Sequence, residues 1–118
     1  MFDPSAIADI YLATWNASAA DRPAKLEGWA ENPVYIDPLM AGSGRADIAA
    51  MMDRAADQFP GHHFELAGTP DGYGTFARFS WALKPVDGEA VAAGTDFIRL
   101  DDDGRIAEVI GFLDGGRA

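Results

Sequence analysis

The chain has 118 residues, a length that predicts one domain over residues 1–118. It carries 19 acidic and 9 basic side chains, which gives a formal net charge of −10 with neutral histidines. This acidic balance argues against partners that need a basic protein surface, such as nucleic acid and anionic membranes. The absence of cysteine excludes disulfides, thiolate nucleophiles and cysteine-ligated metals.

The first ten residues and the longest apolar runs bear on the location of the protein. Residues 1–10 contain no base, so they lack the start of a signal peptide. No apolar run approaches the roughly 20 residues of a membrane span. We therefore expect a cytoplasmic protein.

The N-terminal third predicts two helices. Asp3 can cap a helix that starts at Pro4, because proline suits the first turn. One face of this helix carries apolar side chains at helical spacing: Ile7, Ile10, Tyr11 and Trp15. A shorter helix around Leu26 and Trp29 ends at Asn32-Pro33.

A short strand over residues 34–37 follows, with Tyr35 and Asp37 on the same face. A glycine-containing loop over residues 41–44 leads into the clearest helical pattern of the chain. The apolar side chains of this third helix recur at spacings of three and four: Ile48, Met51, Met52, Ala55, Ala56 and Phe59. Pro60-Gly61 ends it.

From His62 onward the apolar period changes to two, which predicts four strands joined by short turns. The strands cover residues 62–66, 73–84, 89–100 and 105–113, and the turns contain Pro70-Asp71-Gly72, Pro85–Gly88 and Asp101–Gly104. Gly94 and Gly111 lie inside strands and are candidate points for a bend or a bulge. Residues 115–118 are expected to form a frayed tail.

Helices segregated from an antiparallel sheet define an α+β fold. A long curved sheet wrapped around three N-terminal helices forms a cone, which leaves an apolar pocket between the sheet and the helices. We expect large side chains from several elements to line it: Trp15, Trp29, Tyr35, Met52, Phe59, Trp81 and Phe112. The tryptophans and methionines of this set could equally fill the core.

Three polar side chains fall on elements that enclose this pocket. Asp96 shares a strand face with Ile98 and Leu100, so an inward carboxyl there would stay protonated and donate a hydrogen bond. Asp37 stands at the end of a strand beside a flexible loop, a good place for a general base. Tyr11 lies on the apolar face of the first helix, where a buried hydroxyl needs a partner.

Each of these side chains also has a plainer interpretation. Asp96 could lie near the edge of the sheet, hydrated or paired with Arg78 or Arg99. Asp37 precedes a proline and could simply start a turn. Tyr11 could be a core aromatic whose hydroxyl is satisfied. The residues alone leave these alternatives open.

From residue 7 to residue 114 the chain resembles the nuclear transport factor 2-like superfamily, in its SnoaL-like and ketosteroid isomerase-like branch. The resemblance rests on Tyr35-Ile36-Asp37-Pro38, on Gly44-Arg45 at the start of a helix, and on residues 94–97 and 103–106. The order of the elements also matches.

The resemblance to ketosteroid isomerases implies roles for the same three side chains. Their general-base aspartate precedes a proline at the end of the first strand, which matches Asp37. Their oxyanion-hole tyrosine on the first helix matches Tyr11, and their protonated aspartate in the penultimate strand matches Asp96. Two tyrosines that support the oxyanion tyrosine in some of these isomerases are replaced here by Trp29 and Met52.

These matches imply a cofactor-free isomerase or cyclase that removes a proton alpha to the carbonyl of a small apolar substrate. Asp37 would be the base, while Tyr11 and neutral Asp96 would stabilise the enolate oxygen. We expect no metal site, since the adjacent His62 and His63 would point to opposite faces of a strand.

The alternative is a non-catalytic module of the same fold that binds a small ligand or mediates dimerisation. Resembling proteins commonly dimerise through the sheet. We therefore expect a homodimer, and one strand face could serve as its interface: Val91, Ala93, Thr95 and Phe97.

Overall fold

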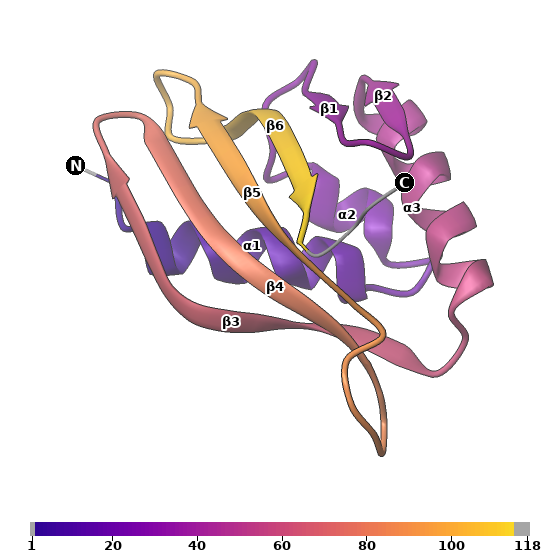
Figure 1. Ribbon diagram of the computed structural model, residues 1–118. Helices are drawn as coiled ribbons and strands as arrows, with labels where there is room; N and C mark the ends of the chain where they lie inside the picture. The colour runs from indigo at the N-terminus through magenta and orange to yellow at the C-terminus, as the bar shows by residue number, and fades with distance from the viewer. Residues whose placement is uncertain (1, 115–118) are drawn as a thin grey trace.

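A six-stranded curved sheet and three helices make up the computed structural model, which describes residues 2–114 (Figure 1). The helices are α1 (Pro4–Asn16), α2 (Arg22–Leu26) and α3 (Arg45–Gln58). The strands are β1 (Val34–Ile36), β2 (Ala41–Ser43), β3 (His62–Tyr73), β4 (Phe76–Pro85), β5 (Ala92–Leu100) and β6 (Ile106–Leu113). The predicted α+β class is confirmed, while the tail predicted over residues 115–118 lies outside the described residues.

The sheet has the strand order β2-β1-β6-β5-β4-β3, and all its neighbours pair antiparallel except β1 and β6. These two strands run parallel. After β1 the chain forms β2, crosses through α3 to the opposite edge of the sheet, and returns strand by strand from β3 to β6 (Figure 1). In this register Ile36 of β1 pairs with Ile110 of β6. The end of β1 therefore lies inside the sheet, between β2 and β6.

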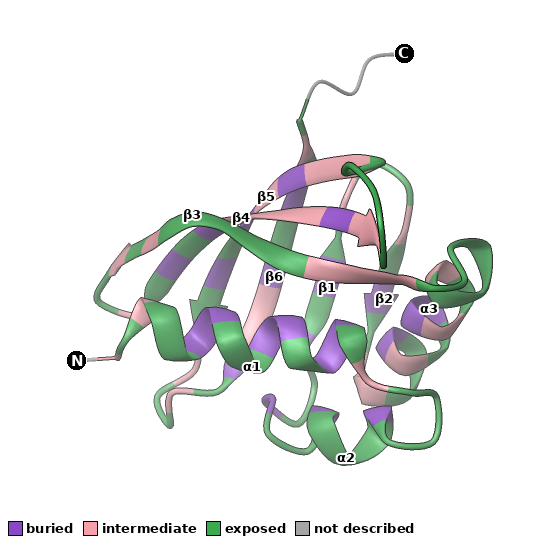
Figure 2. Cartoon of the chain, turned by 90° about the horizontal axis from the view of Figure 1, so that it is seen from below, coloured by how far each residue is buried: buried purple, intermediate pink, exposed green. Residues whose placement is uncertain are grey.

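Helix α1 packs against the sheet, and its buried side chains face the strands (Figure 2). Most of its buried face is apolar: Ile7, Ala8, Tyr11, Leu12, Thr14 and Trp15. Ile10, which was predicted on this face, is instead 46 % exposed, because at 100° per residue it falls beyond the edge of a face centred between Tyr11 and Trp15. Within residues 2–114, no helix has the length and apolarity needed to cross a membrane.

Three segments differ from the sequence prediction. Residues 41–43, expected as loop, form β2 and pair with β1. Pro70-Asp71-Gly72, expected as a turn, lies inside β3, which continues through a register shift between Ala67 and Asp71. A proline is tolerated there because β3 is an edge strand. The second helix is shorter than expected and ends at Leu26.

Gly94 and Gly111 are not bulges, since β5 and β6 pair in regular register through both. The irregularity in this pair lies between Arg99 and Leu100. The two glycines instead make room for neighbouring side chains. A Cβ at Gly94 would lie 2.5 Å from the indole of Trp81, so the absent side chain lets that ring cross the strand.

Arg22 is a buried cation that joins all three helices. Its guanidinium donates to the carbonyls of Thr14, Trp15 and Ala17 near the end of α1, and to the carboxylate of Asp53 on α3. The side chain is 1 % exposed. It therefore supplies donors to carbonyl groups in the last turn of α1 and at its cap, of which that of Thr14 also accepts from the N–H of Ala17.

We expect Arg22→Met to lower the free energy of unfolding by about 2–4 kcal/mol, because three carbonyl groups near the end of α1 and the carboxylate of Asp53 each lose a charged donor. Denaturant unfolding measures the change. Arg54→Met, at an exposed position of the same helix as Asp53, is the matched control. Equal losses in the two variants would contradict the structural role of Arg22.

Candidate active site

Three adjacent strands bring Asp37 and Asp96 to the same level of the sheet. Asp37 directly follows Ile36, whose partner Ile110 precedes Gly111 on β6, and Asp96 pairs with Gly111 from the other side. A Cβ added at Gly111 would lie 2.8 Å from Oδ1 of Asp96 and 3.1 Å from the Cβ of Asp37. Both side chains therefore project over one glycine.

Asp96 is almost completely enclosed, with 2 % of its surface exposed. The hydroxyl of Tyr11 donates to its Oδ2 at 2.5 Å. Burial raises the pKa of Asp96 from 3.8 to about 6, while the donors on Tyr11 and Trp81 act in the opposite direction. The alternative partners Arg78 and Arg99 bind other carboxylates.

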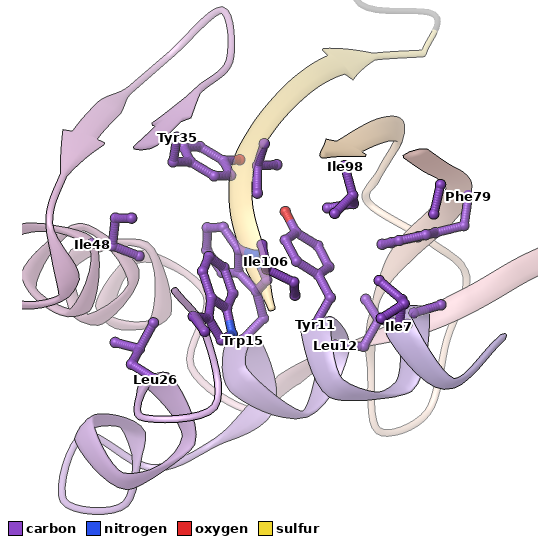
Figure 3. Close-up of a cluster of buried hydrophobic side chains, with 14 of the residues drawn as sticks. Ile7, Tyr11, Leu12, Trp15, Leu26, Tyr35, Ile48, Phe79, Ile98 and Ile106 are labelled. Atoms are coloured by element: carbon purple, nitrogen blue, oxygen red, sulfur yellow. The ribbon is translucent and has the colours of Figure 1, made fainter. Parts of the chain in front are cut away.

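Tyr11 projects from helix α1 into the core (Figure 3). Its hydroxyl reaches Asp96, and its ring is fixed from two sides. Trp29 stacks on it with ring centroids 5.8 Å apart, and Phe79 meets it edge-on at 5.2 Å. Burial, followed by the charge of Asp96, raises the pKa of Tyr11 well above its ordinary value. The phenol is therefore a fixed donor that keeps its proton.

Asp37 is half-buried, and both of its carboxylate oxygens are held. Oδ2 accepts from the hydroxyl of Tyr35 at 2.5 Å. Oδ1 accepts from the backbone N–H groups of Leu39 and Met40 at 2.7 and 2.9 Å. Asp37 therefore starts a turn, as one interpretation of the sequence held, and its carboxylate also lines the cavity described next.

Both carboxyls open into a cavity of about 130 Å³ between α1, α3 and the sheet. Of the side chains predicted to line the pocket, four do so: Trp15, Tyr35, Phe59 and Trp81. Further lining residues are Tyr11, Leu12, Asp37, Leu39, Met40, Ala55, Phe64, Leu83, Ala92, Asp96 and Leu113. Among these described residues the lining contains no lysine, arginine or histidine.

Three predicted lining residues lie elsewhere. Trp29 and Met52 are 0 % exposed core residues, and the indole of Trp29 donates to Thr14 at 3.0 Å. Phe112 is 54 % exposed, because alternation along β6 turns Gly111 toward the cavity and Phe112 to the outer face, against Phe97.

Several lining residues were not predicted from the sequence. Leu39 and Met40 reach the cavity because the turn closed by Asp37 folds back over it, which hydrophobic periodicity does not encode. Phe64 and Leu113 carried a usable signal. Each lies on the inward face of its strand by the period of two, Leu113 two residues after Gly111.

The hypothesis that Asp37 and Asp96 act together in catalysis predicts that Gly111→Ala lowers kcat/KM by about 100-fold, since the added methyl would displace the carboxyl of Asp96 relative to Asp37. Steady-state kinetics with an α-proton-exchanging substrate measure the effect. Gly28→Ala is the control, because a Cβ there meets only the carbonyl of Lys25 at 3.4 Å, an ordinary contact. Unchanged kinetics in Gly111→Ala would show that the spacing of the carboxyls does not matter.

The SnoaL-like domain family matches residues 8–109 of the chain. A solved structure from Agrobacterium tumefaciens strain C58, named as a suspected isomerase of the SnoaL-like family, is 52 % identical, with 95 % of this chain and 97 % of that chain covered and a TM-score of 0.91. This chain belongs to the SnoaL-like family. The predicted superfamily is therefore confirmed.

More distant solved structures share the fold. A suspected polyketide cyclase from Sinorhizobium meliloti is 20 % identical, with a TM-score of 0.71 and coverage of 93 % of this chain and 99 % of that one. A SnoaL-like protein of unknown function from Burkholderia thailandensis is 16 % identical, with a TM-score of 0.75 and 95 % of each chain covered. No curated protein matches the chain.

Proposed function

We propose that this SnoaL-like protein is an isomerase or cyclase that removes a proton alpha to a carbonyl and stabilises the resulting enolate. One observation carries the proposal. Asp37 and Asp96 project over Gly111 into one apolar cavity, and Tyr11 donates to Asp96 there. The names of two structural relatives, a suspected isomerase and a suspected polyketide cyclase, are consistent with enolate chemistry.

In the proposed reaction the two carboxyls have different roles. Asp37, held by three donors, accepts the α-proton as the C–H bond breaks and returns it to the same carbon or to another one. The electron pair of that bond passes to the carbonyl oxygen. As the negative charge develops, neutral Asp96 donates to this oxygen. The hydroxyl of Tyr11, which donates to Asp96 in the free protein, rotates and donates its single proton to the same oxygen.

The environment of Asp96 supports its role as a donor. A carboxyl enclosed by apolar side chains favours its neutral form, and the pKa of about 6 makes that form accessible near neutral pH. Tyr11 keeps its proton over the same range because burial raises its pKa. Each step therefore uses only carboxyl and phenol groups of this chain.

The cavity also limits the substrate. Its volume of about 130 Å³ is smaller than the roughly 300–1,000 Å³ of pockets for drug-sized ligands. Two carboxyl groups and no basic side chain among the described lining residues disfavour an anionic substrate. We therefore propose a small, uncharged ketone or enone with an acidic α-carbon.

Exchange of the substrate α-proton with deuterium oxide, followed by proton NMR, tests the proposal on a panel of small cyclic enones. The proposal expects exchange catalysed by the protein. Binding of panel members without exchange would favour the alternative, a non-catalytic module that binds small ligands.

The proposed assembly is a homodimer formed through the outer face of the sheet. This face exposes apolar side chains on three neighbouring strands: Ile36, Phe97, Ile110 and Phe112. Val91 and Phe97 of the predicted interface are exposed by 55 and 41 %. Light scattering coupled to size exclusion would contradict the dimer by finding a monomer.

A further inference from the structure

Tyr35 stands two residues before Asp37, so strand alternation turns both side chains to the concave face of the sheet. Its hydroxyl donates to Oδ2 of Asp37 at 2.5 Å. The side chain is 5 % exposed, and its ring meets Trp15 edge-on with centroids 5.8 Å apart (Figure 3). Such packing fixes the place from which the hydroxyl donates.

The other oxygen of Asp37 is occupied by the turn that follows. Oδ1 accepts from the N–H groups of Leu39 and Met40, and the N–H of Asp37 donates to the carbonyl of Met40 at 2.9 Å. A carboxylate oxygen offers about two lone-pair directions. Oδ1 is therefore filled, whereas Oδ2 keeps one direction open beside the bond from Tyr35.

We propose that Tyr35 is a positioning residue that presents the open side of Oδ2 of Asp37 to the α-carbon of the substrate. This inference rests on the proposed function. In the step concerned, the C–H bond breaks, the proton bonds to Oδ2, and the electron pair moves into the enolate. The hydroxyl of Tyr35 keeps its own proton and continues to donate to Oδ2.

Without that hydroxyl, only the turn would hold the carboxylate, through Oδ1. The carboxylate could then rotate about its bond to Cβ and move Oδ2 off the line of proton transfer. A base misplaced by about 1 Å costs up to about 100-fold in rate. Tyr35→Phe keeps the ring that lines the cavity and removes only the hydroxyl, so the loss should fall on kcat rather than KM.

The first test compares Tyr35→Phe with Tyr73→Phe, the matched control at a tyrosine that is 77 % exposed. We expect Tyr35→Phe to lower kcat by about 10- to 100-fold with little change in KM, and Tyr73→Phe to match the wild type. An active wild type, an inactive Asp37→Asn variant and an unchanged Tyr35→Phe variant would overturn this inference while the proposed function stands.

The second test is a double-mutant cycle, which separates positioning from a general structural effect. If Tyr35 acts only through Asp37, then Tyr35→Phe lowers the residual rate of the Asp37→Asn variant no further. Losses that multiply in the double variant would show that Tyr35 acts by another route.

Proton NMR tests the contact itself, independently of turnover. A short hydroxyl–carboxylate bond gives a low-field proton signal, which should vanish in both Tyr35→Phe and Asp37→Asn and persist in Tyr73→Phe. If these two variants lose no signal in common, the contact is absent in solution and the inference is wrong. A wild type that shows the signal but no α-proton exchange would instead overturn the proposed function.

Discussion

Asp37→Asn is expected to lower kcat/KM for an uncharged enone by about 100- to 10,000-fold, the range that a positioned general base contributes. An amide at this position can still accept hydrogen bonds through its oxygen, so the turn over Leu39 and Met40 can persist. It cannot accept the α-proton. The loss should therefore be chemical rather than structural.

The control for this variant is Asp103→Asn, which removes a carboxylate at an exposed position in the hairpin between β5 and β6. It changes the net charge equally and should leave the kinetics unchanged. Circular dichroism and thermal melting establish that both variants are folded. Turnover that survives in a folded Asp37→Asn variant would show that another group is the base.

Asp96→Ala and Asp96→Asn should have opposite outcomes, because the proposed role of Asp96 is to donate a hydrogen bond in its neutral form. Alanine removes the donor, and kcat should fall by about 100- to 1,000-fold. Asparagine supplies a permanently neutral donor, while its oxygen can still accept from Tyr11. We expect that variant to keep most of the wild-type activity.

The pH dependence separates the two variants further. With a pKa of about 6, Asp96 is neutral in the free protein mainly below that pH, so wild-type kcat/KM should fall as the pH rises above about 6. Asp96→Asn has no such group, and its profile should be flat on the alkaline side. An inactive Asp96→Asn variant would indicate that the carboxylate form of Asp96 does the work.

The same titration bears on stability. The pKa of Asp96 in the folded protein lies above the ordinary 3.8, so the folded state binds the proton more strongly than the unfolded state. The resulting stability is fully present below about pH 4 and is lost as the pH rises through about 6. The free energy of unfolding of Asp96→Asn, measured relative to that of the wild type, should therefore be about 2–3 kcal/mol higher at pH 8 than at pH 4.

The placement of the three candidate catalytic side chains was accessible from the sequence, because it depends on local periodicity. The period of two puts Asp96 on the same strand face as Ile98, and both side chains are buried in the structure. The helical period puts Tyr11 on the same helix face as Trp15, and these two are buried as well. The end of β1 likewise places Asp37 at the cavity. Their catalytic roles remain predictions.

What periodicity could not supply was the register between strands. The convergence of Asp37 and Asp96 depends on β1 lying parallel to β6, a pairing between segments more than 70 residues apart. Because the sequence does not give this register, it predicted a bend or a bulge at Gly111 and not a glycine over which two carboxyls project. The same limit explains Phe112, whose outward direction follows once Gly111 faces the cavity.

The periodicity of apolar residues also could not predict which of them line the cavity and which are buried in the core. Trp29 and Met52 carry the apolar character of pocket residues, yet the packing of α2 and α3 places them behind Tyr11 and in the core. The contact between Tyr35 and Asp37 joins residues two apart, which alternation permits but does not require. Only the three-dimensional structure shows that this lining tyrosine also holds a carboxylate.

The most direct test of the central claim, that two carboxyls at one cavity divide the roles of base and donor, is α-proton exchange in deuterium oxide. The wild type, Asp37→Asn and Asp96→Asn are compared at pH 7 by proton NMR with one uncharged enone. We predict exchange in the wild type and in Asp96→Asn, and its loss in Asp37→Asn. Exchange that survives in Asp37→Asn but vanishes in Asp96→Asn would contradict the assignment.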